Sequence, residues 1–253
     1  MARAAVQRRL TWLHATVVES LAETPRVHRL VLDVPDWPGH LPGQHVDLRL
    51  TAPDGYTAQR SYSIASAPEE RQLHLLVERF EGGEVSPYLT AEARAGDVLE
   101  LRGPIGGWFV WSAAADQEGR PADGVRPVQL VAGGSGVSPF LAMLGHHRRA
   151  ASTTPIRLLW SARRAEDAVV RDDLGPETTV TLTRGAPPGW PGETGRIDEG
   201  LLERHAFGPA TRPRTFVCGP TDFVETTATA LVDLGHDPAW IRLERFGSSG
   251  SRT

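Results

Sequence analysis

The sequence predicts two domains, an antiparallel β-barrel or sandwich followed by an α/β domain with a parallel sheet. At 253 residues, the chain is long enough for two domains that each bury a core. In the first half, short runs of alternating apolar and polar residues are separated by turns such as Pro53-Asp54-Gly55. In the second half, apolar runs of strand length alternate with stretches of helical spacing, which is typical of parallel βαβ units.

The first domain is expected over residues 10–112. Its strand candidates alternate apolar residues with polar or smaller ones, so each presents one apolar face. These runs lie at Leu30 to Val34, Val46 to Leu50 and Leu73 to Val77. One short helix is expected from about Ser86 to Ala93, before the turn at Gly96-Asp97.

Residues 113–126 are rich in small and polar residues and lack periodicity, so we expect a linker or long loop there. The second domain is expected over residues 127–247, followed by a flexible tail at residues 248–253. Its strands are expected at Val128 to Ala132, Ile156 to Trp160, Val180 to Thr183, Thr215 to Cys218 and Ile241 to Glu244. Helices are expected from Val137 to Leu144, from about Glu166 to Leu174, and from Pro220 to Gly235.

The composition excludes several classes of site. Cys218 is the only cysteine, so the sequence holds no disulfide framework, no cysteine zinc site and no four-cysteine iron–sulfur cluster, and no metal is expected. The net charge of −4 argues against nucleic acid as a partner. Neither a membrane-spanning apolar run nor a secretory signal is visible, so we expect no membrane span and a cytoplasmic protein. The histidines are scattered, and His146-His147 is expected on a solvated helix face.

Residues 60–66, Arg-Ser-Tyr-Ser-Ile-Ala-Ser, are the most informative stretch. Strand alternation would direct Arg60, Tyr62 and Ile64 to one side, and Ser61 and Ser63 to the other. An aromatic ring and hydroxyl donors beside a fixed cation suit a flat heteroaromatic ligand that carries phosphate. The alternative is an edge strand with a solvated face.

Three glycine-containing turns stand where α/β and barrel proteins bind ligands. Gly133-Gly134-Ser135-Gly136 lies between a strand and a helix, a place suited to a dinucleotide phosphate or simply to a tight turn. Gly82-Gly83 with Ser86 precedes the first helix and suits a second phosphate, or a plain turn and helix cap. Cys218-Gly219-Pro220 ends a strand at the ligand-binding edge, although a lone cysteine there is usually a small buried hydrophobe.

Taken in order, these motifs resemble the ferredoxin–NADP reductase family of flavoproteins. The matching strings are Pro42-Gly43-Gln44, Arg60-Ser61-Tyr62-Ser63, Gly82-Gly83 with Ser86, Gly103-Pro104-Ile105-Gly106, Val131 to Pro139, and Cys218-Gly219-Pro220. The resemblance covers residues 12–247. It implies a six-stranded antiparallel Greek-key barrel that binds FAD, followed by a Rossmann-like α/β domain with a five-stranded parallel sheet that binds NAD(P).

The resemblance also implies roles for single residues. Ser63 and Cys218 would be the catalytic residues, with Ser63 at the flavin N5 and Cys218 near the nicotinamide ring. The other cofactor contacts implied are Arg60 on the FAD pyrophosphate, Tyr62 on the isoalloxazine, Val85 and Ser86 on the FAD phosphates, Gly134, Ser135 and Gly136 on the dinucleotide phosphates, and Gly219 beside the nicotinamide.

The end of the chain differs from plant-type members of that family, which finish on an aromatic residue that covers the flavin. Here the sequence continues beyond Phe246. Phe246 is expected either to contact the flavin or to have a simple packing role, and Glu244 is expected near the ring.

The residues after the second strand of the α/β domain bear on the choice of nicotinamide cofactor. An acidic residue there would bind the ribose hydroxyls of NADH, whereas a serine and arginines fit the 2′-phosphate of NADPH. Ser161 and Arg163 therefore favour NADPH, while Glu166 and Asp167 just beyond leave NADH possible.

We expect an FAD-dependent oxidoreductase that takes a hydride from NADPH and passes electrons singly to a separate soluble acceptor, with a ferredoxin expected from family analogy. A separate acceptor follows because the single cysteine rules out a four-cysteine cluster in this sequence. Two alternatives are a reductase of free flavin, ferric chelate or quinone, and a non-catalytic flavin- or nucleotide-binding subunit of a larger enzyme.

Overall fold

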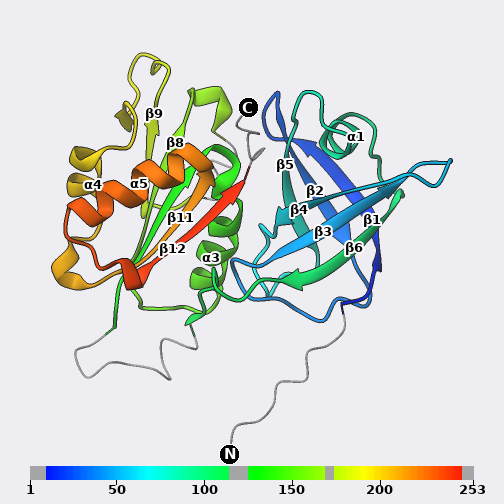
Figure 1. The fold of residues 1–253 in the computed structure, drawn as a ribbon, viewed down its shortest axis with the longest axis horizontal. Helices are drawn as coiled ribbons and strands as arrows, with labels where there is room; N and C mark the ends of the chain where they lie inside the picture. The colour runs from blue at the N-terminus through cyan, green and yellow to red at the C-terminus, as the bar shows by residue number, and fades with distance from the viewer. Residues whose placement is uncertain (1–9, 114–124, 169–173, 247–253) are drawn as a thin grey trace, which may run out of the picture.

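The computed structural model describes residues 10–113, 125–168 and 174–246. It contains two β-sheets that lie side by side, with the antiparallel one at the right of Figure 1 and the parallel one at the left. Most of the linker expected at 113–126 and the whole tail expected at 248–253 fall outside the described residues. The boundaries expected at 10–112 and 127–247 stay predictions.

The antiparallel sheet is a six-stranded barrel with the order β4-β3-β6-β1-β2-β5. Its strands are β1 (Leu13–Ala22), β2 (Val27–Asp33), β3 (His45–Thr51), β4 (Thr57–Ser63), β5 (Leu73–Glu78) and β6 (Val98–Ile105). The strand β6 returns to lie between β3 and β1, which gives the Greek-key arrangement expected. A bridge between Ile64, directly after β4, and Leu75 of β5 joins the two edges and closes the barrel.

The barrel interior is filled by the apolar face that the alternation predicts. Leu30 and Leu32 of β2, Leu48 of β3 and Leu75 of β5 are fully buried in one cluster. The helix α1 (Val85–Ala91) buries Val85 and Leu89 against the same core, close to the position expected for it.

The parallel sheet has six strands in the order β10-β9-β8-β7-β11-β12, one more than expected. The strands are β7 (Val128–Gly133), β8 (Ile156–Ala162), β9 (Thr178–Leu182), β10 (Glu193–Thr194), β11 (Arg214–Pro220) and β12 (Ile241–Phe246). The extra strand, β10, is only two polar residues long, so it leaves no alternation to detect.

Helices cover both faces of this sheet (Figure 1). The helix α3 (Ser138–Arg149) follows the short 3₁₀ turn η1 (Gly134–Val137) and lies between the sheet and the barrel. The helices α4 (Glu199–His205) and α5 (Thr221–Asp233) pack on the other face against Val131, Leu159 and Val217. No helix in the described ranges is long and apolar enough to cross a membrane.

Two helix predictions differ from the structure. The helix expected from Glu166 to Leu174 begins instead as the 3₁₀ turn Ala165–Asp167, and Ala168 is extended; residues 169–173 lie outside the described ranges. The helix α4 was not predicted, because it has only seven residues and carries Gly200 inside. Its start is fixed by Asp198, whose carboxylate accepts a hydrogen bond from the Leu201 amide at 2.8 Å.

The chain that leaves the barrel packs into the second domain. Phe109 and Trp111 belong to the core cluster of α3 and the parallel sheet, and the Phe109 ring meets Phe216 edge-on at 5.3 Å. His146 and His147 both contact Trp111, with ring centroids 5.8 and 5.9 Å away. The expectation that these histidines lie on a solvated helix face is therefore wrong, because that part of α3 faces the barrel.

Candidate functional site

The β4 run directs its side chains as the alternation predicts. Tyr62 and Ile64 pack on the barrel core, whereas the Ser61 hydroxyl lies on the other side and donates to Asp47 at 2.7 Å. Burial raises the pKa of the Tyr62 phenol, and the nearby positive charge of Arg60 opposes that rise. Ser63, the last residue of β4, is half-buried opposite His45 of β3.

Arg60 is an exposed cation beside the start of α1. Its Nη1 donates to the carbonyl of its own neighbour Gln59 at 2.7 Å, and no carboxylate among the described residues pairs with it. Tyr56, whose hydroxyl donates to Glu84 at 3.0 Å, links the β3–β4 hairpin to the residue before α1. The guanidinium therefore remains available to an anion placed between β4 and α1.

The turn before α1 is built by its own hydrogen bonds. The Ser86 hydroxyl oxygen accepts from the Phe80 amide at 3.0 Å, and the Gly83 amide donates to the Phe80 carbonyl at 3.0 Å. The Val85 side chain is 1% exposed in the barrel core. Contact between Val85 and a phosphate would thus have to come from its backbone.

The glycine turn between β7 and α3 is held against β11. A Cβ added to Gly136 would lie 2.4 Å from the Cys218 carbonyl oxygen, so only glycine fits there. Gly134 has φ of +56°, and its carbonyl accepts from the Trp160 indole at 2.9 Å. The Ser135 hydroxyl donates to Glu78 of the barrel at 2.7 Å. This turn therefore has the tight strand–helix geometry expected, with Gly134 and Ser135 on its accessible side.

A hydrogen bond joins the two predicted cofactor segments. The Ser138 hydroxyl at the start of α3 donates to the Ser63 carbonyl at the end of β4, at 3.0 Å. Residues 75 positions apart in the sequence therefore meet at the boundary between the barrel and the parallel sheet.

Cys218, Glu244 and His45 gather at the same boundary. Cys218 is buried and faces Glu244 in the register of β11 and β12. Burial, and then the Glu244 carboxylate, raise the pKa of the Cys218 thiol, so it stays protonated. His45 Nδ1 lies 3.9 Å from Glu244 Oε1, and burial lowers the pKa of His45.

Glu244 is the least satisfied of these groups. Burial raises its pKa to about 7, and its Oε2 has no hydrogen-bond partner among the described residues. A buried carboxylate oxygen without a partner marks a place where a ligand or water can bind. The sequence pattern indicated Glu244 only through its place near the chain end and gave no sign of His45, because their proximity depends on how the two domains meet.

The remaining predicted residues lie at the edge of the parallel sheet. Phe246 pairs with Pro220 and packs, partly buried, on the core of the second domain, and its contact with the flavin stays a prediction. Ser161 is half-buried beside Gly133, and Arg163 is exposed just beyond β8. The Arg184 amide donates to the Arg163 carbonyl at 2.8 Å, so Arg184 joins this edge although it was not predicted. Arg184 could have been predicted from its position two residues beyond β9, at the same edge of the sheet.

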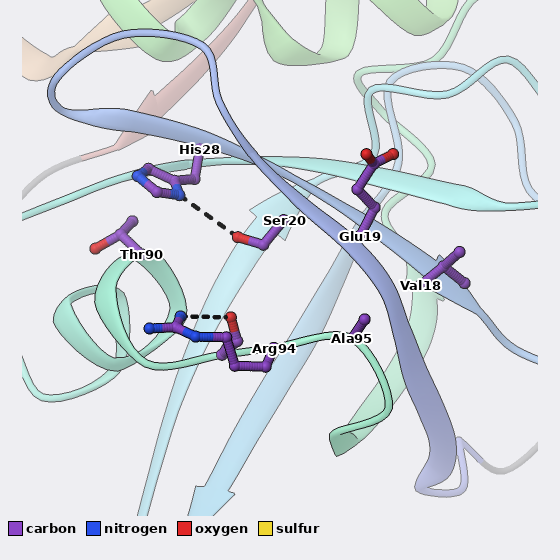
Figure 2. Close-up of a pocket in the computed structure, with 8 residues that line it drawn as sticks. Val18, Glu19, Ser20, His28, Thr90, Arg94 and Ala95 are labelled. Carbon is purple, nitrogen blue, oxygen red and sulfur yellow. Dashed lines mark hydrogen bonds between the residues drawn. The ribbon is translucent and has the colours of Figure 1, made fainter.

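A pocket lies elsewhere on the barrel, between β1, β2 and the segment after α1 (Figure 2). It has a volume of about 610 Å³ and is lined by Val18, Glu19, Ser20, His28, Thr90, Ala93, Arg94 and Ala95. Figure 2 shows His28 directed toward Ser20, at 3.4 Å, and Arg94 on the other side. None of the predicted site residues lines this pocket, so it is separate from the boundary site.

Comparisons with known proteins agree with this geometry. Residues 14–110 match the oxidoreductase FAD-binding domain, and residues 130–229 match the oxidoreductase NAD-binding domain. The chain is 34% identical to ferredoxin–NADP reductase B of Sorangium cellulosum over 218 residues, which cover 81% of this chain and 84% of that protein. The chain belongs to the ferredoxin reductase-like family of FAD- and NAD(P)-binding oxidoreductases.

Other proteins similar to this chain are longer than it is. The chain is 26% identical to the electron transfer component of toluate 1,2-dioxygenase from Pseudomonas putida, and the match covers 83% of this chain but only 59% of that protein. It shares its fold with a cytochrome P450 reductase of Amycolatopsis, with a TM-score of 0.80, 24% identity, and coverage of 97% of this chain and 73% of that one.

The residues present fit both cofactors of the family. Arg60 is a cation without an acidic partner among the described residues, and no described atom lies within 4 Å of a Cβ added to Gly134, so the accessible side of the glycine turn is open to a pyrophosphate. The Glu244 Oε2, which no described residue satisfies, lies where the two predicted cofactor segments meet. The residues predicted to face FAD and those predicted to face the nicotinamide thus lie on opposite sides of one boundary.

Proposed function

We propose that the protein takes electrons from NADPH through bound FAD and passes them singly to a separate acceptor protein, a ferredoxin. The observation that carries this proposal is the hydrogen bond between Ser138 and Ser63, which brings the glycine turn beside the β4 run. When bound, FAD would supply two-electron acceptance and one-electron release, and the protein would supply binding and orientation.

The chain's own residues divide this work. Arg60 would hold the FAD phosphates, Tyr62 would support the ring, and the Ser63 hydroxyl would donate a hydrogen bond at N5. Glu244 would gain or release a proton near neutral pH, because burial raises its pKa to about 7. The buried Cys218 thiol would stay neutral and help to exclude water from the boundary.

NADPH is the proposed donor because three polar groups gather at the end of β8 and β9. Ser161 is near the end of β8 and Arg163 directly follows it, and the Arg184 amide donates to the Arg163 carbonyl. Arginine is well suited to a 2′-phosphate because its guanidinium donates several hydrogen bonds to phosphate oxygens.

The separate acceptor is supported by the sequence and by the names of the relatives. Cys218 is the only cysteine in this sequence, so the sequence itself cannot hold a four-cysteine cluster. Relatives include the electron transfer component of toluate 1,2-dioxygenase and methane monooxygenase component C. The relatives also include NADH-cytochrome b5 reductases.

Two measurements test this function. The visible spectrum of the purified protein should show bound flavin, and anaerobic stopped-flow mixing should bleach it faster with NADPH than with NADH. Turnover should then require an added ferredoxin. Flavin that dissociates and is reduced in solution would instead select the free-flavin reductase, and no bleaching with either nucleotide would select the non-catalytic subunit. The cytoplasmic location stays a prediction that cell fractionation tests.

A further inference from the structure

His146 connects three segments of the chain. Its Nδ1 lies 2.6 Å from Glu69 Oε1, in the turn between β4 and β5, and its Nε2 lies 3.2 Å from the amide of Ala113. A backbone amide only donates, so Nε2 must accept and carry no proton. The proton therefore resides on Nδ1, which donates it to Glu69. This bridge, defined as Glu69, His146 and Ala113, requires a neutral imidazole.

The surroundings of the bridge hold the imidazole ring in place. The His146 side chain is 13% exposed and meets the buried Trp111 ring edge-on. Next to it in α3, a Cβ added to Gly145 would lie 3.1 Å from the Ala67 Cβ, so α3 lies tightly against the barrel turn. Arg149 reinforces this contact through Glu70, at 3.7 Å.

The bridge, with the pair of Arg149 and Glu70 beside it, attaches the C-terminal part of α3 to the barrel. The start of the helix is attached separately, where Ser138 donates to the Ser63 carbonyl. A helix of 12 residues is about 18 Å long and stiff, so one attachment leaves it free to pivot and two fix its angle. The glycine turn Gly134–Val137 continues directly into α3 and moves with it.

We propose that His146 is a positioning residue that sets the angle of α3, and thereby holds the glycine turn in place relative to Ser63. This inference rests on the proposed function, since electron transfer between two cofactors depends on how the two domains are placed. An ångström of misplacement can cost about 100-fold in rate.

Four variants of the full-length, FAD-loaded protein test the proposal. His146→Ala removes both bonds, His146→Asn keeps a donor that can reach Glu69, and His146→Gln keeps an acceptor that can reach Ala113. His147→Ala is the control, because it leaves the bridge intact and removes a hydrogen bond to Thr154 within the second domain. The readouts are flavin reduction by NADPH in a single turnover, small-angle X-ray scattering and thermal unfolding.

We expect His146→Ala to slow reduction about tenfold with unchanged NADPH affinity, and to broaden the distance distribution between the domains. Asn and Gln should fall between Ala and the wild type. Wild-type rate and scattering in His146→Ala, or a lower unfolding temperature alone, would overturn the proposal. Absence of reduction in the wild type would instead count against the proposed function, and scattering would still decide the role of His146.

Discussion

Glu244 lies directly beside Cys218 in the parallel register of β11 and β12, at the boundary between the two domains. The thiol is 1% exposed, and one carboxylate oxygen of Glu244 has no hydrogen-bond partner in the part of the chain that the structure describes. His45 approaches from the barrel, with its Nδ1 3.9 Å from Glu244 Oε1. The boundary thus contains a carboxylate that is poorly solvated and whose charge changes near neutral pH.

The Glu244→Gln variant is expected to be more stable than the wild type at high pH. The folded pKa is about 7 against an ordinary value of 4.5, so the folded state binds more protons between these values. The free energy of unfolding therefore falls as pH rises through this window, by about 3 kcal/mol in total for this group. Gln carries no charge, so the difference between the variant and the wild type should be near zero at pH 4.5 and largest above pH 7.

Thermal unfolding across pH 4.5 to 8.5, without added nucleotide, measures this difference. Glu225→Gln is the matched control, because Glu225 is exposed and pairs with Arg245 at 2.7 Å on the outside of the same domain. A difference for Glu244→Gln that stays constant with pH would show that the buried carboxylate does not titrate as described.

The Gly136→Ala variant is expected to lose about 1–3 kcal/mol of stability, as overpacking usually does. The added Cβ would lie 2.4 Å from the Cys218 carbonyl oxygen, and backbone atoms on both sides leave no simple relief. Gly208→Ala is the control, since no atom of the described residues lies within 4 Å of a Cβ added there and its φ is −64°. Chemical denaturation of both variants compares them, and equal midpoints would contradict the close approach of the turn to β11.

Much of the fold could be predicted because local patterns determine it. The alternation at β2, β3 and β5 places one residue in two against a core, and the apolar runs at β7, β8 and β11 are buried on both faces. The missed elements, β10 and α4, are short and carry little periodic signal.

The site was predicted less completely, because its partners are distant in the sequence. The glycine turn that follows Gly133 and the run of β4 around Arg60 were predicted from local chemistry. The contacts of Ser135 with Glu78 and of His146 with Glu69 span 57 and 77 residues, and they depend on how the two domains pack. A pattern read along one strand or helix holds no information on which distant side chain will face it.

The Arg60→Ala variant is expected to bind FAD about 10- to 100-fold more weakly, since a charge-assisted phosphate contact is lost. Fluorescence titration of the flavin-free protein measures the dissociation constant. Arg71→Ala is the control, because the Arg71 side chain is 89% exposed and lies 3.8 Å from Asp33. Unchanged affinity in Arg60→Ala would remove Arg60 from the FAD site.

The Ser63→Ala variant is expected to retain FAD and to be reduced by NADPH about tenfold more slowly, a change of about 1.4 kcal/mol in the barrier. The backbone carbonyl that accepts from Ser138 remains, so the domain contact should persist. Ser61→Ala is the control, since its hydroxyl lies on the other side of β4 and donates to Asp47. Equal reduction rates in the two variants would argue that the Ser63 hydroxyl takes no part in the reaction.

The Arg163→Ala variant is expected to raise the KM for NADPH about 10- to 100-fold and to leave the KM for NADH unchanged, because only NADPH carries the 2′-phosphate. Arg184→Ala should act in the same direction, since the backbone bond between the two residues places both arginines at one edge. Arg164→Ala is the control, because Arg164 pairs with Glu166 at 3.3 Å and is already neutralised. Steady-state kinetics with both nucleotides measures these KM values. An equal rise in KM for NADH and NADPH would mean that the arginines contact a part of the nucleotide that both share. The preference for NADPH would then have another source.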